Sequence, residues 1–290
     1  MSSSAPPLPS QAPSITFYRP AAPLRDSIES YFIFNLDRPA RDIVQPGWSH
    51  MGWVLEGAWR AGQFGGELSP VPPVAFGGPR ERAMVAQGTP GRVIALTLTP
   101  LGWTRLVGAN ASKYDGQTVP MSQVIGPGCE ALLPRLREAG DAAALELLDA
   151  FFLARLRATR ADKNVEQAFG FLLEGAVATV GDWSARLGMS VRQLERLCAR
   201  HFGLSPKRLL RRQRLLRAIA QIQRDPSLGW SAAIGADYAD QPHFVREFRW
   251  FMHITPGTWL RRERNLVRRV GKRESPQKVA SIQSIPEKAG

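Results

Sequence analysis

The spacing of hydrophobic residues changes along the chain from a two-residue period to a helical one. Between Ile15 and about Ile125, short runs of β-forming residues predict strands. The clearest runs are Ser30–Leu36, Met51–Leu55 and Arg92–Thr99. In the last run, Ile94, Leu96 and Leu98 alternate with other residues, so they are predicted to share one buried face of a strand.

Glycine and proline divide this first region into short pieces. Twelve of the 30 residues from Gly62 to Gly91 are Gly or Pro, and these residues favour turns and loops. Many short strands that close on one another are typical of a small barrel or sandwich. We therefore expect a β-rich N-terminal domain with a small-barrel, cupin-like fold.

A helical period begins after Cys129. Leucine and phenylalanine recur at near-helical spacing up to Arg160, with an interruption around Gly140, which predicts two helices. An all-helical region follows, so the fold class is α+β and multidomain. The expected segments are a disordered tail (1–13), a β-rich sensor or dimerisation domain with C-terminal helices (14–160), a linker near 161–164, an all-α domain (164–265) and a disordered tail (271–290).

The helical region contains the same device twice. Each copy has a short segment, a turn and a second helical segment that exposes arginine and glutamine. The first copy spans Thr179–Ser190 and then Val191–Arg200; the second spans Trp230–Asp240 and then Gln241–Arg249. A basic helix behind such a turn can place side chains in the major groove of DNA.

In the first copy, Ser190 is a good N-cap and Gln193 completes a capping-box pattern. Gly188 suits a turn that needs positive φ. Leu194 and Cys198 fall on the inward face, together with Leu197. The outward residues, which are candidates for DNA contact together with Ser190, are Arg192, Gln193, Glu195, Arg196 and Arg200. Arginine, glutamine and glutamate can pair with guanine, adenine and cytosine, respectively, although a solvated polar face is the simpler alternative.

In the second copy, Asp240 is the expected cap and three phenylalanines form a buried ridge, at Phe244, Phe248 and Phe251. The candidates for DNA contact are Gln241, His243, Arg246 and Arg249, the last more suited to a phosphate than to a base. A helix over Pro206–Gln223 would join the two copies. Its inward residues are predicted to be Leu209, Leu215, Leu216, Ile219 and Ile222. Its arginines at 208, 211, 212 and 214 cannot all face inward.

The net charge supports a nucleic-acid partner. The chain carries +13, and the segment Arg160–Arg273 has 22 Lys and Arg against ten Asp and Glu, so it holds twelve of those charges. Cationic side chains gain affinity for DNA by releasing its counterions. A basic surface that only maintains solubility is the alternative.

These residues resemble the DNA-binding domain of AraC/XylS-type transcription regulators. The matching positions are Leu187–Ser190, Leu194, Phe202–Pro206, Arg214, Ala218, Tyr238–Gln241, His243, Phe244, Arg246, Phe248, Arg249, Thr255 and Pro256. The resemblance covers about a third of the chain, from about Lys163 to Arg264. It implies two helix-turn-helix units joined by one helix, with DNA contacts from the helices that begin near Ser190 and Gln241.

Three positions depart from the pattern of that family. Asp237 and His253 stand where glycine is usual, and both residue types tolerate positive φ better than most. Ala232 replaces a larger aliphatic residue, so the second unit is expected to pack more loosely. We therefore expect the first unit to read sequence and the second to contribute more to anchoring.

The N-terminal region resembles, weakly, the β-rich domain that precedes some of these regulators. The similar segments are Val44–Trp48 and Leu98–Gly102. In the family, such domains sense small molecules, dimerise, or do both. Effector contact is assigned to Trp48, Trp53 and Trp59, whereas Phe64 and Phe76 are further aromatic candidates. Aromatic residues in a small β-domain are more often plain core.

The sequence therefore predicts a sequence-specific transcription regulator, which is an activator or a repressor and not an enzyme. Its expected partners are double-stranded DNA, a small effector, a second copy, and RNA polymerase if it activates. Non-specific nucleic-acid binding is one alternative. DNA-alkylation repair is another, disfavoured because Cys129 lies in a helical stretch without a Pro-Cys-His setting and Cys198 is predicted to face inward.

No cofactor or metal site is expected, since His50 has no second ligand nearby in the sequence. Two cysteines do not make a disulfide framework. The chain shows no signal peptide and no apolar run near the ~18 residues of a membrane span. A cytoplasmic location without membrane contact is expected.

Overall fold

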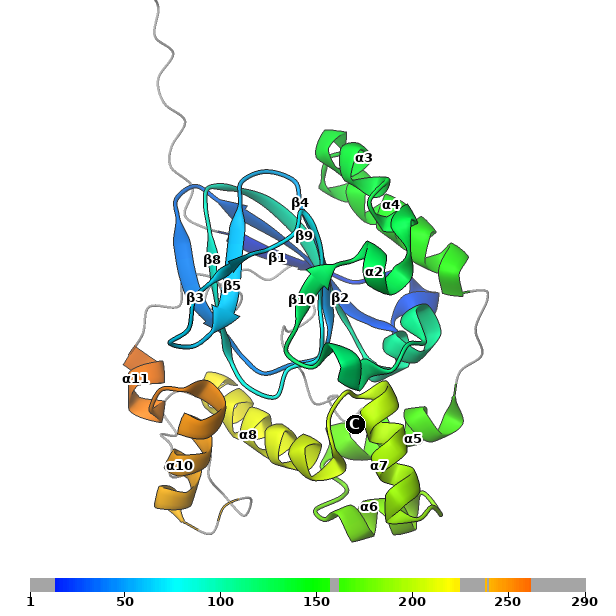
Figure 1. Ribbon diagram of the computed structural model, residues 1–290, viewed down its shortest axis with the longest axis vertical. Coiled ribbons are helices and arrows are strands. Elements are labelled where there is room, and N and C mark those ends of the chain that lie inside the picture. The colour runs from blue at the N-terminus through cyan, green and yellow to red at the C-terminus, as the bar shows by residue number, and fades with distance from the viewer. Residues whose placement is uncertain (1–13, 157–161, 225–237, 239, 262–290) are drawn as a thin grey trace, which may run out of the picture.

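The computed structural model describes residues 14–156, 162–224, 238 and 240–261, and its N-terminal part is built from two antiparallel sheets. The six-stranded sheet has the order β1 (Ser14–Tyr18), β2 (Ile28–Leu36), β9 (Gly91–Leu98), β4 (His50–Val54), β7 (Val74–Gly77) and β10 (Thr118–Pro120). The four-stranded sheet has the order β3 (Ala40–Val44), β8 (Met84–Gly88), β5 (Trp59–Gln63) and β6 (Ser69–Pro70). The sheets face each other as a small barrel (Figure 1). The β-rich first domain and the three predicted strands are confirmed.

The six-stranded sheet is buried on both faces, and its residues alternate between them. Tyr31, Ile33, Trp53 and Ile94 belong to the main core cluster, which includes the helices that follow the barrel. Their strand neighbours, such as Phe32, line the space between the two sheets. Ile94, Leu96 and Leu98 share the helix-facing side, as their alternation predicts.

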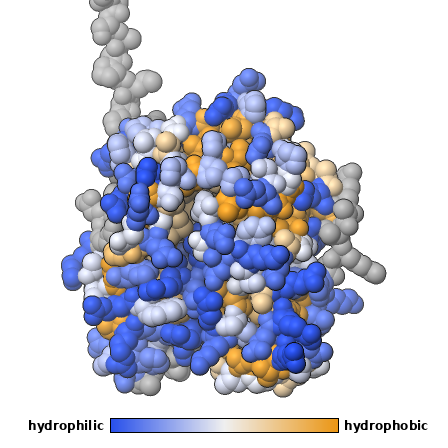
Figure 2. Space-filling view, in the orientation of Figure 1, coloured by the Kyte–Doolittle hydropathy of each residue, from blue (hydrophilic) through white to orange (hydrophobic). Residues whose placement is uncertain are grey.

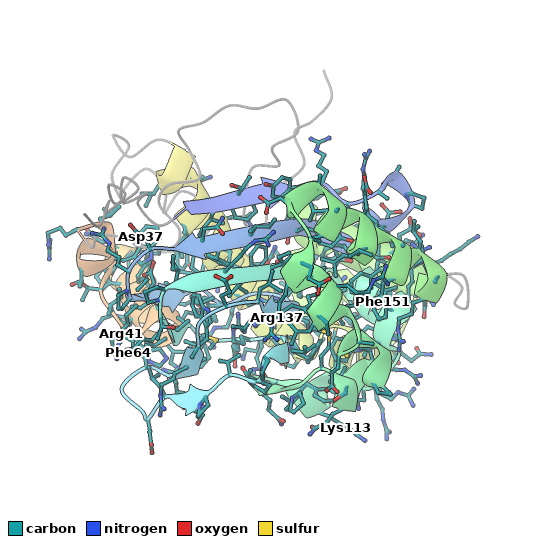
Figure 3. The ribbon with its side chains drawn as sticks, turned by 90° about the horizontal axis from the view of Figure 1, so that it is seen from above. Asp37, Arg41, Phe64, Lys113, Arg137 and Phe151 are labelled. Atoms are coloured by element: carbon teal, nitrogen blue, oxygen red, sulfur yellow. The ribbon has the colours of Figure 1, made fainter. Side chains whose placement is uncertain are left out.

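Short helical segments connect the strands and lead into the first long helices. They are η1 (Ala22–Leu24), α1 (Pro100–Gly102), η2 (Trp103–Val107), η3 (Ala111–Tyr114), α2 (Ser122–Ile125) and η4 (Pro127–Cys129). The two helices predicted around Gly140 are α3 (Leu132–Glu138) and α4 (Asp141–Leu156). They cover the outer face of the six-stranded sheet, and Phe151 projects from that layer (Figure 3).

Polar contacts hold α4 against this sheet. The Asp149 carboxylate accepts hydrogen bonds from the Tyr31 hydroxyl at 2.8 Å and from the Ala21 backbone N–H at 3.1 Å. Arg92 of β9 pairs with Asp141, at the start of α4, at 2.6 Å. Because Tyr31 is fully buried, the carboxylate satisfies a hydroxyl that would otherwise lose its hydrogen bond to water.

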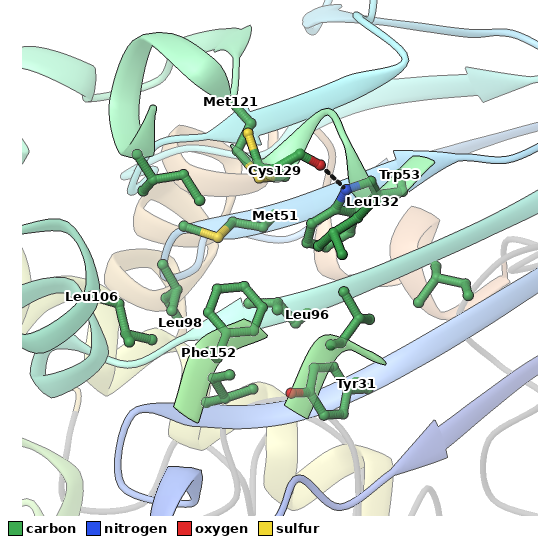
Figure 4. Close-up of a cluster of buried hydrophobic side chains, with 14 of the residues drawn as sticks. Tyr31, Met51, Trp53, Leu96, Leu98, Leu106, Met121, Cys129, Leu132 and Phe152 are labelled. Atoms are coloured by element: carbon green, nitrogen blue, oxygen red, sulfur yellow. Dashed lines mark hydrogen bonds between the residues drawn. The ribbon is translucent and has the colours of Figure 1, made fainter. Parts of the chain in front are cut away.

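Trp53 belongs to this core, so its assignment to an effector pocket is wrong. Its indole Nε1 donates to the Cys129 carbonyl at 2.9 Å and its ring packs on Phe152 (Figure 4). The strand period explains the correction: in β4, His50, Gly52 and Val54 face the barrel interior, whereas Met51 and Trp53 face the helices. Phe76 is also core, packed on Trp103 and Tyr114.

The C-terminal part is helical throughout the residues that the structure describes. Its helices are α5 (Lys163–Glu174), α6 (Val180–Arg186), α7 (Val191–His201), α8 (Pro206–Arg224), α10 (Gln241–Met252) and α11 (Pro256–Arg261). Asp162 caps α5, so Lys163 and Asn164 are helical rather than part of the predicted linker. The five aliphatic residues predicted to face inward from α8 are all buried. No described helix is long and apolar enough to cross a membrane.

Helix α8 runs beneath the barrel, between α10 and α11 on one side and α5 to α7 on the other (Figure 1). Arg212, one of its four clustered arginines, does pack inward and is 0% exposed. Its Nη1 donates to the carbonyls of Gly47 at 3.0 Å and Arg80 at 3.1 Å, and its guanidinium lies 4.0 Å from the centre of the Trp48 ring. The barrel thus holds the middle of the helix.

Further contacts join the start of α8 and the end of α10 to the barrel. Arg208 of α8 pairs with Glu81 and, at 3.3 Å, with Asp115. Arg82 Nε donates to the Trp250 carbonyl at 2.8 Å, and the Ala83 backbone N–H donates to the Phe251 carbonyl at 2.8 Å. The C-terminus of α10 is therefore also bound to the barrel.

Candidate nucleic-acid interface

Helices α6 and α7 form the predicted first helix-turn-helix unit. The Thr179 hydroxyl caps α6 by accepting from the Asp182 N–H at 3.1 Å. Between the helices, Gly188 has φ of 62°, a left-handed conformation that glycine adopts without steric cost. Thr179 at the start of α6 and Gly188 between the helices therefore account for the local geometry of this unit.

Helix α7 begins with the predicted capping box. The Ser190 hydroxyl accepts from the Gln193 N–H at 3.3 Å, and the Gln193 side-chain carbonyl accepts from the Ser190 N–H at 2.8 Å. This carbonyl is therefore occupied at the cap. Pairing with adenine uses both the amide oxygen and the amide nitrogen, so Gln193 would have to leave the cap to read a base.

The two faces of α7 are arranged as predicted. Leu194 and Cys198 are fully buried against Trp183 and neighbouring apolar residues, and Leu197 is half-buried. Arg192, Gln193, Glu195, Arg196 and Arg200 are all exposed. One side of the helix thus carries a core, while the other presents charged groups to solvent.

Val191 was not among the predicted contacts. It is the first residue of α7 and its side chain is 44% exposed, which is unusual for a β-branched apolar residue. An apolar group at the start of a recognition helix suits the C5-methyl group of thymine. The sequence signal for it was an apolar residue on the polar face of the predicted helix.

Helix α10 has the second predicted set. Asp240 caps it by accepting from the His243 N–H at 2.6 Å, and Phe244, Phe248 and Phe251 form the fully buried ridge. On the other face, Gln241, Arg246 and Arg249 are exposed and His243 is half-buried beside Tyr238. The first helix of this unit, with Ala232 and Asp237, lies outside the described residues.

His253 ends α10 with φ of 60°, as expected for a position where glycine is usual. Its ring stacks on Phe64 of the barrel, with the ring centroids 5.5 Å apart and the planes within 4°. The side chain therefore makes a contact between the two parts of the chain that glycine could not make, which offsets the cost of the left-handed conformation.

A cavity of about 270 Å³ lies between the two sheets of the barrel. Its walls are mainly apolar, and they include Trp48 and Trp59, two of the three tryptophans predicted there. Its polar lining includes Asp42, His50 and Arg80. A volume of this size with few polar groups suits a small organic molecule.

Arg80 and His50 give this cavity its local electrostatics. Arg80 is 7% exposed, and burial lowers its pKa to about 10. Its Nη1 lies 3.1 Å from His50 Nδ1. Burial, followed by the nearby Arg80 charge, holds the pKa of His50 well below its usual range, so this ring is neutral and accepts the hydrogen bond.

The two thiols are not activated. Burial raises the pKa of Cys129 and, more strongly, that of Cys198, so both are protonated at neutral pH. Cys129 Sγ lies 3.1 Å from the Gly126 carbonyl. Among the described residues, no group of three His, Cys, Asp or Glu side chains could hold a metal ion.

Comparison with known proteins agrees with this arrangement. Residues 183–262 match the family described as Helix-turn-helix domain. No curated protein matches the chain.

Solved structures to which the chain shows similarity include ToxT from Vibrio cholerae (11% identity, covering 86% of this chain and 98% of ToxT, TM-score 0.45). A structure of ToxT bound to an unsaturated fatty acid has 12% identity, covers 81% of this chain and 95% of that one, and has a TM-score of 0.44. The AraC-like transcriptional activator CuxR has 17% identity, covers 68% and 79%, and has a TM-score of 0.28.

The capped α6–α7 unit, its basic outward face and the family match define a helix-turn-helix domain suited to binding DNA. This domain, over residues 183–262, is where the sequence resembles AraC-type regulators.

Proposed function

We propose that α7 reads DNA sequence, chiefly through Arg192 and Arg196, with Glu195 and Val191 beside them. The observation that carries this proposal is the exposed face of a helix whose N-terminus is fixed by a complete capping box. A fixed helix holds its side chains in register with the base edges, and arginine pairs with guanine through two hydrogen bonds. Helix α10, with Gln241, His243, Arg246 and Arg249, adds mainly anchoring contacts.

The test is selection of bound DNA from a random pool by the full-length protein, followed by footprinting. We expect two short blocks of fixed sequence about one helical turn, roughly 34 Å, apart. Failure to enrich any sequence, with or without added effector, would contradict sequence-specific binding.

Alanine variants of two arginines on α7 then test which side chains contact the DNA bases. Arg192→Ala or Arg196→Ala should weaken binding to the selected site by about 1–3 kcal/mol and barely change binding to random DNA. Arg186→Ala is the matched control, because Arg186 is an exposed arginine on α6, paired with Asp182. Equal losses on both DNAs would favour the alternative of non-specific nucleic-acid binding.

We also propose that the barrel cavity binds a small, largely apolar effector, in contact with Trp48 and Trp59. Its support is the mainly apolar space between the sheets and the position of Trp48, which borders the cavity and also contacts Arg212 of α8. A ligand that moves Trp48 would therefore change a contact between the barrel and α8 of the DNA-binding part.

The probe for this cavity is the fluorescent dye 8-anilinonaphthalene-1-sulfonate. Ala95→Leu fills part of the cavity from β9, and it should weaken dye binding and leave DNA binding intact. Ala131→Leu makes the same change at an exposed position and is the control. Equal dye binding by the wild-type protein and Ala95→Leu would rule out the cavity as the site.

The remaining proposals concern assembly. We assign residues 14–160 to sensing or dimerisation and 164–265 to DNA binding. A homodimer would appear as a doubling of mass in solution and of the footprint on DNA. Contact with RNA polymerase applies only if the protein activates transcription, which a reporter assay with the selected site would decide.

A further inference from the structure

A groove of about 430 Å³ lies between α8 and α10, apart from the predicted reading face of α7. We call it the α8–α10 groove. Its lining residues are Lys207, Arg211, Arg214, His243, Arg246, Glu247 and Trp250. The helical half of the molecule on the face drawn in Figure 2 is mainly hydrophilic, with smaller apolar patches.

The groove has an excess of positive charge. Four of its side chains, from Lys207, Arg211, Arg214 and Arg246, are cationic, and Glu247 is its one carboxylate. Glu247 Oε1 lies 2.8 Å from Arg211 Nε and 3.5 Å from Arg214 Nη2. One carboxylate cannot neutralise four cations, so the groove attracts an anion.

Two of these arginines are held in place by a buried carboxylate and by aromatic rings. The Glu247 side chain is only 3% exposed, so its pairs with Arg211 and Arg214 are shielded from water on one side. The Arg211 guanidinium also lies 4.9 Å from the centre of the Trp250 ring, and that of Arg214 lies 5.1 Å from that of Tyr238. Such fixed guanidiniums lose little side-chain entropy when they bind an anion.

The position of the groove indicates which anion it takes. His243 and Arg246 belong both to the groove and to the polar face of α10. DNA that lies against this face would carry one of its strands past the groove and the N-terminal turn of α8. The repeated charges of that strand are phosphates, for which arginine forks and lysine are suitable partners.

We propose that the α8–α10 groove binds a phosphate of the DNA backbone, with Lys207, Arg214 and Arg246 as its main contacts. The inference rests on the proposed DNA-binding function and adds to it a role for α8. Helix α8 then does more than set the distance between the two helix-turn-helix units, because it also binds the DNA strand that α10 approaches.

The experiment measures binding of full-length protein to its selected site over a range of salt concentrations. Lys207→Ala should weaken binding to cognate and random DNA alike and reduce the slope of log K against log salt by about one. Lys207 is exposed on α8, and alanine is a good helix former, so the fold should persist. Arg41→Ala is the control, since it removes one charge from an exposed position of the barrel (Figure 3).

A neutral phosphate identifies the contact. Single methylphosphonates placed along the site should weaken wild-type binding at one or two positions beside the α10 block, and Lys207→Ala should be insensitive at those positions. An unchanged salt slope, or equal methylphosphonate sensitivity in wild type and variant, overturns the inference while wild-type sequence selection still supports the function. A groove that serves an acidic protein partner would give that result. No sequence selection by the wild type would instead contradict the function itself.

Discussion

At the scale of single residues, arginines of this protein have very different environments. Arg192 and Arg196 are exposed on α7, whereas Arg212 of α8 is buried against the barrel and Arg80 is buried at the barrel cavity. Sequence patterning identified the exposed pair, because a helical period separates polar from apolar positions. It did not identify Arg212, because its burial depends on two carbonyls and a tryptophan that are more than 130 residues away.

Val191 provides a prediction at this scale. If its methyl groups meet a thymine methyl, replacing that thymine by deoxyuridine should cost the wild-type protein about 0.8 kcal/mol, the value of one buried methylene. Val191→Ala should bind both DNAs more nearly equally. Titrations with thymines replaced one at a time would measure this, and the same loss for both proteins would show that Val191 does not make the contact.

The histidines predict loss of stability in acid. Burial lowers the pKa of His50, His201 and His253 in the folded chain, so the unfolded chain takes up protons first, from about pH 6.5 downward. The histidine contribution to the free energy of unfolding should therefore be constant near pH 8 and fall below pH 6.5, by up to about 1.4 kcal/mol per pH unit for His50 and by less for the more exposed His201 and His253. His50→Gln should reduce this slope in urea titrations at pH 8 and 5.5. If the variant's stability depends on pH as steeply as that of the wild-type protein, His50 is not a source of this pH dependence.

At the scale of elements, the helices were predictable where local capping and periodicity agree. Ser190 with Gln193, and Asp240 before Phe244, give the starts of α7 and α10, and glycine at 188 permits the turn between α6 and α7. These signals act over a few residues. The strands could also be located, but alternation alone does not tell which face meets the helices and which meets the cavity. Trp53 was assigned to the wrong face for this reason.

The cap of α7 gives the prediction at this scale. Ser190→Ala removes the hydroxyl that accepts from Gln193 and should lower the free energy of unfolding by about 1 kcal/mol, whereas Ser190→Gly should cost only a few tenths. Both variants should weaken binding to the selected site in the same order, because the start of α7 would fray. Urea unfolding and DNA titration measure the two effects. Tighter cognate binding by Ser190→Ala would indicate instead that release of Gln193 helps base reading.

At the scale of the whole molecule, the barrel holds the DNA-binding part at α8 and at the end of α10. Arg212 and Arg208 fix α8, while Arg82, Ala83 and Phe64 contact the end of α10. These contacts fix α8 and the end of α10 on one surface of the barrel. A change at the cavity wall could then alter how the two units meet successive major grooves.

Arg212→Ala tests this coupling. It removes two hydrogen bonds of a buried charged group and should lower the free energy of unfolding by roughly 2–4 kcal/mol, after partial offset from losing the buried charge. We expect one thermal transition in the wild-type protein and two in the variant. Arg186→Ala, on the exposed face of α6, should remain within about 0.5 kcal/mol of wild type. A single transition in Arg212→Ala would show that the other contacts suffice for coupling.

The sequence by itself determined the helix-turn-helix device, its caps, its polar and apolar faces, and the β-rich character of the first domain. Each of these follows from interactions between residues close together in the chain. Tertiary structure decided which tryptophans border the cavity, that His253 stacks on Phe64, and that Arg212 joins α8 to the barrel. Those outcomes depend on contacts between groups that lie far apart in the sequence. The spacing of residues along a single sequence does not reveal such contacts.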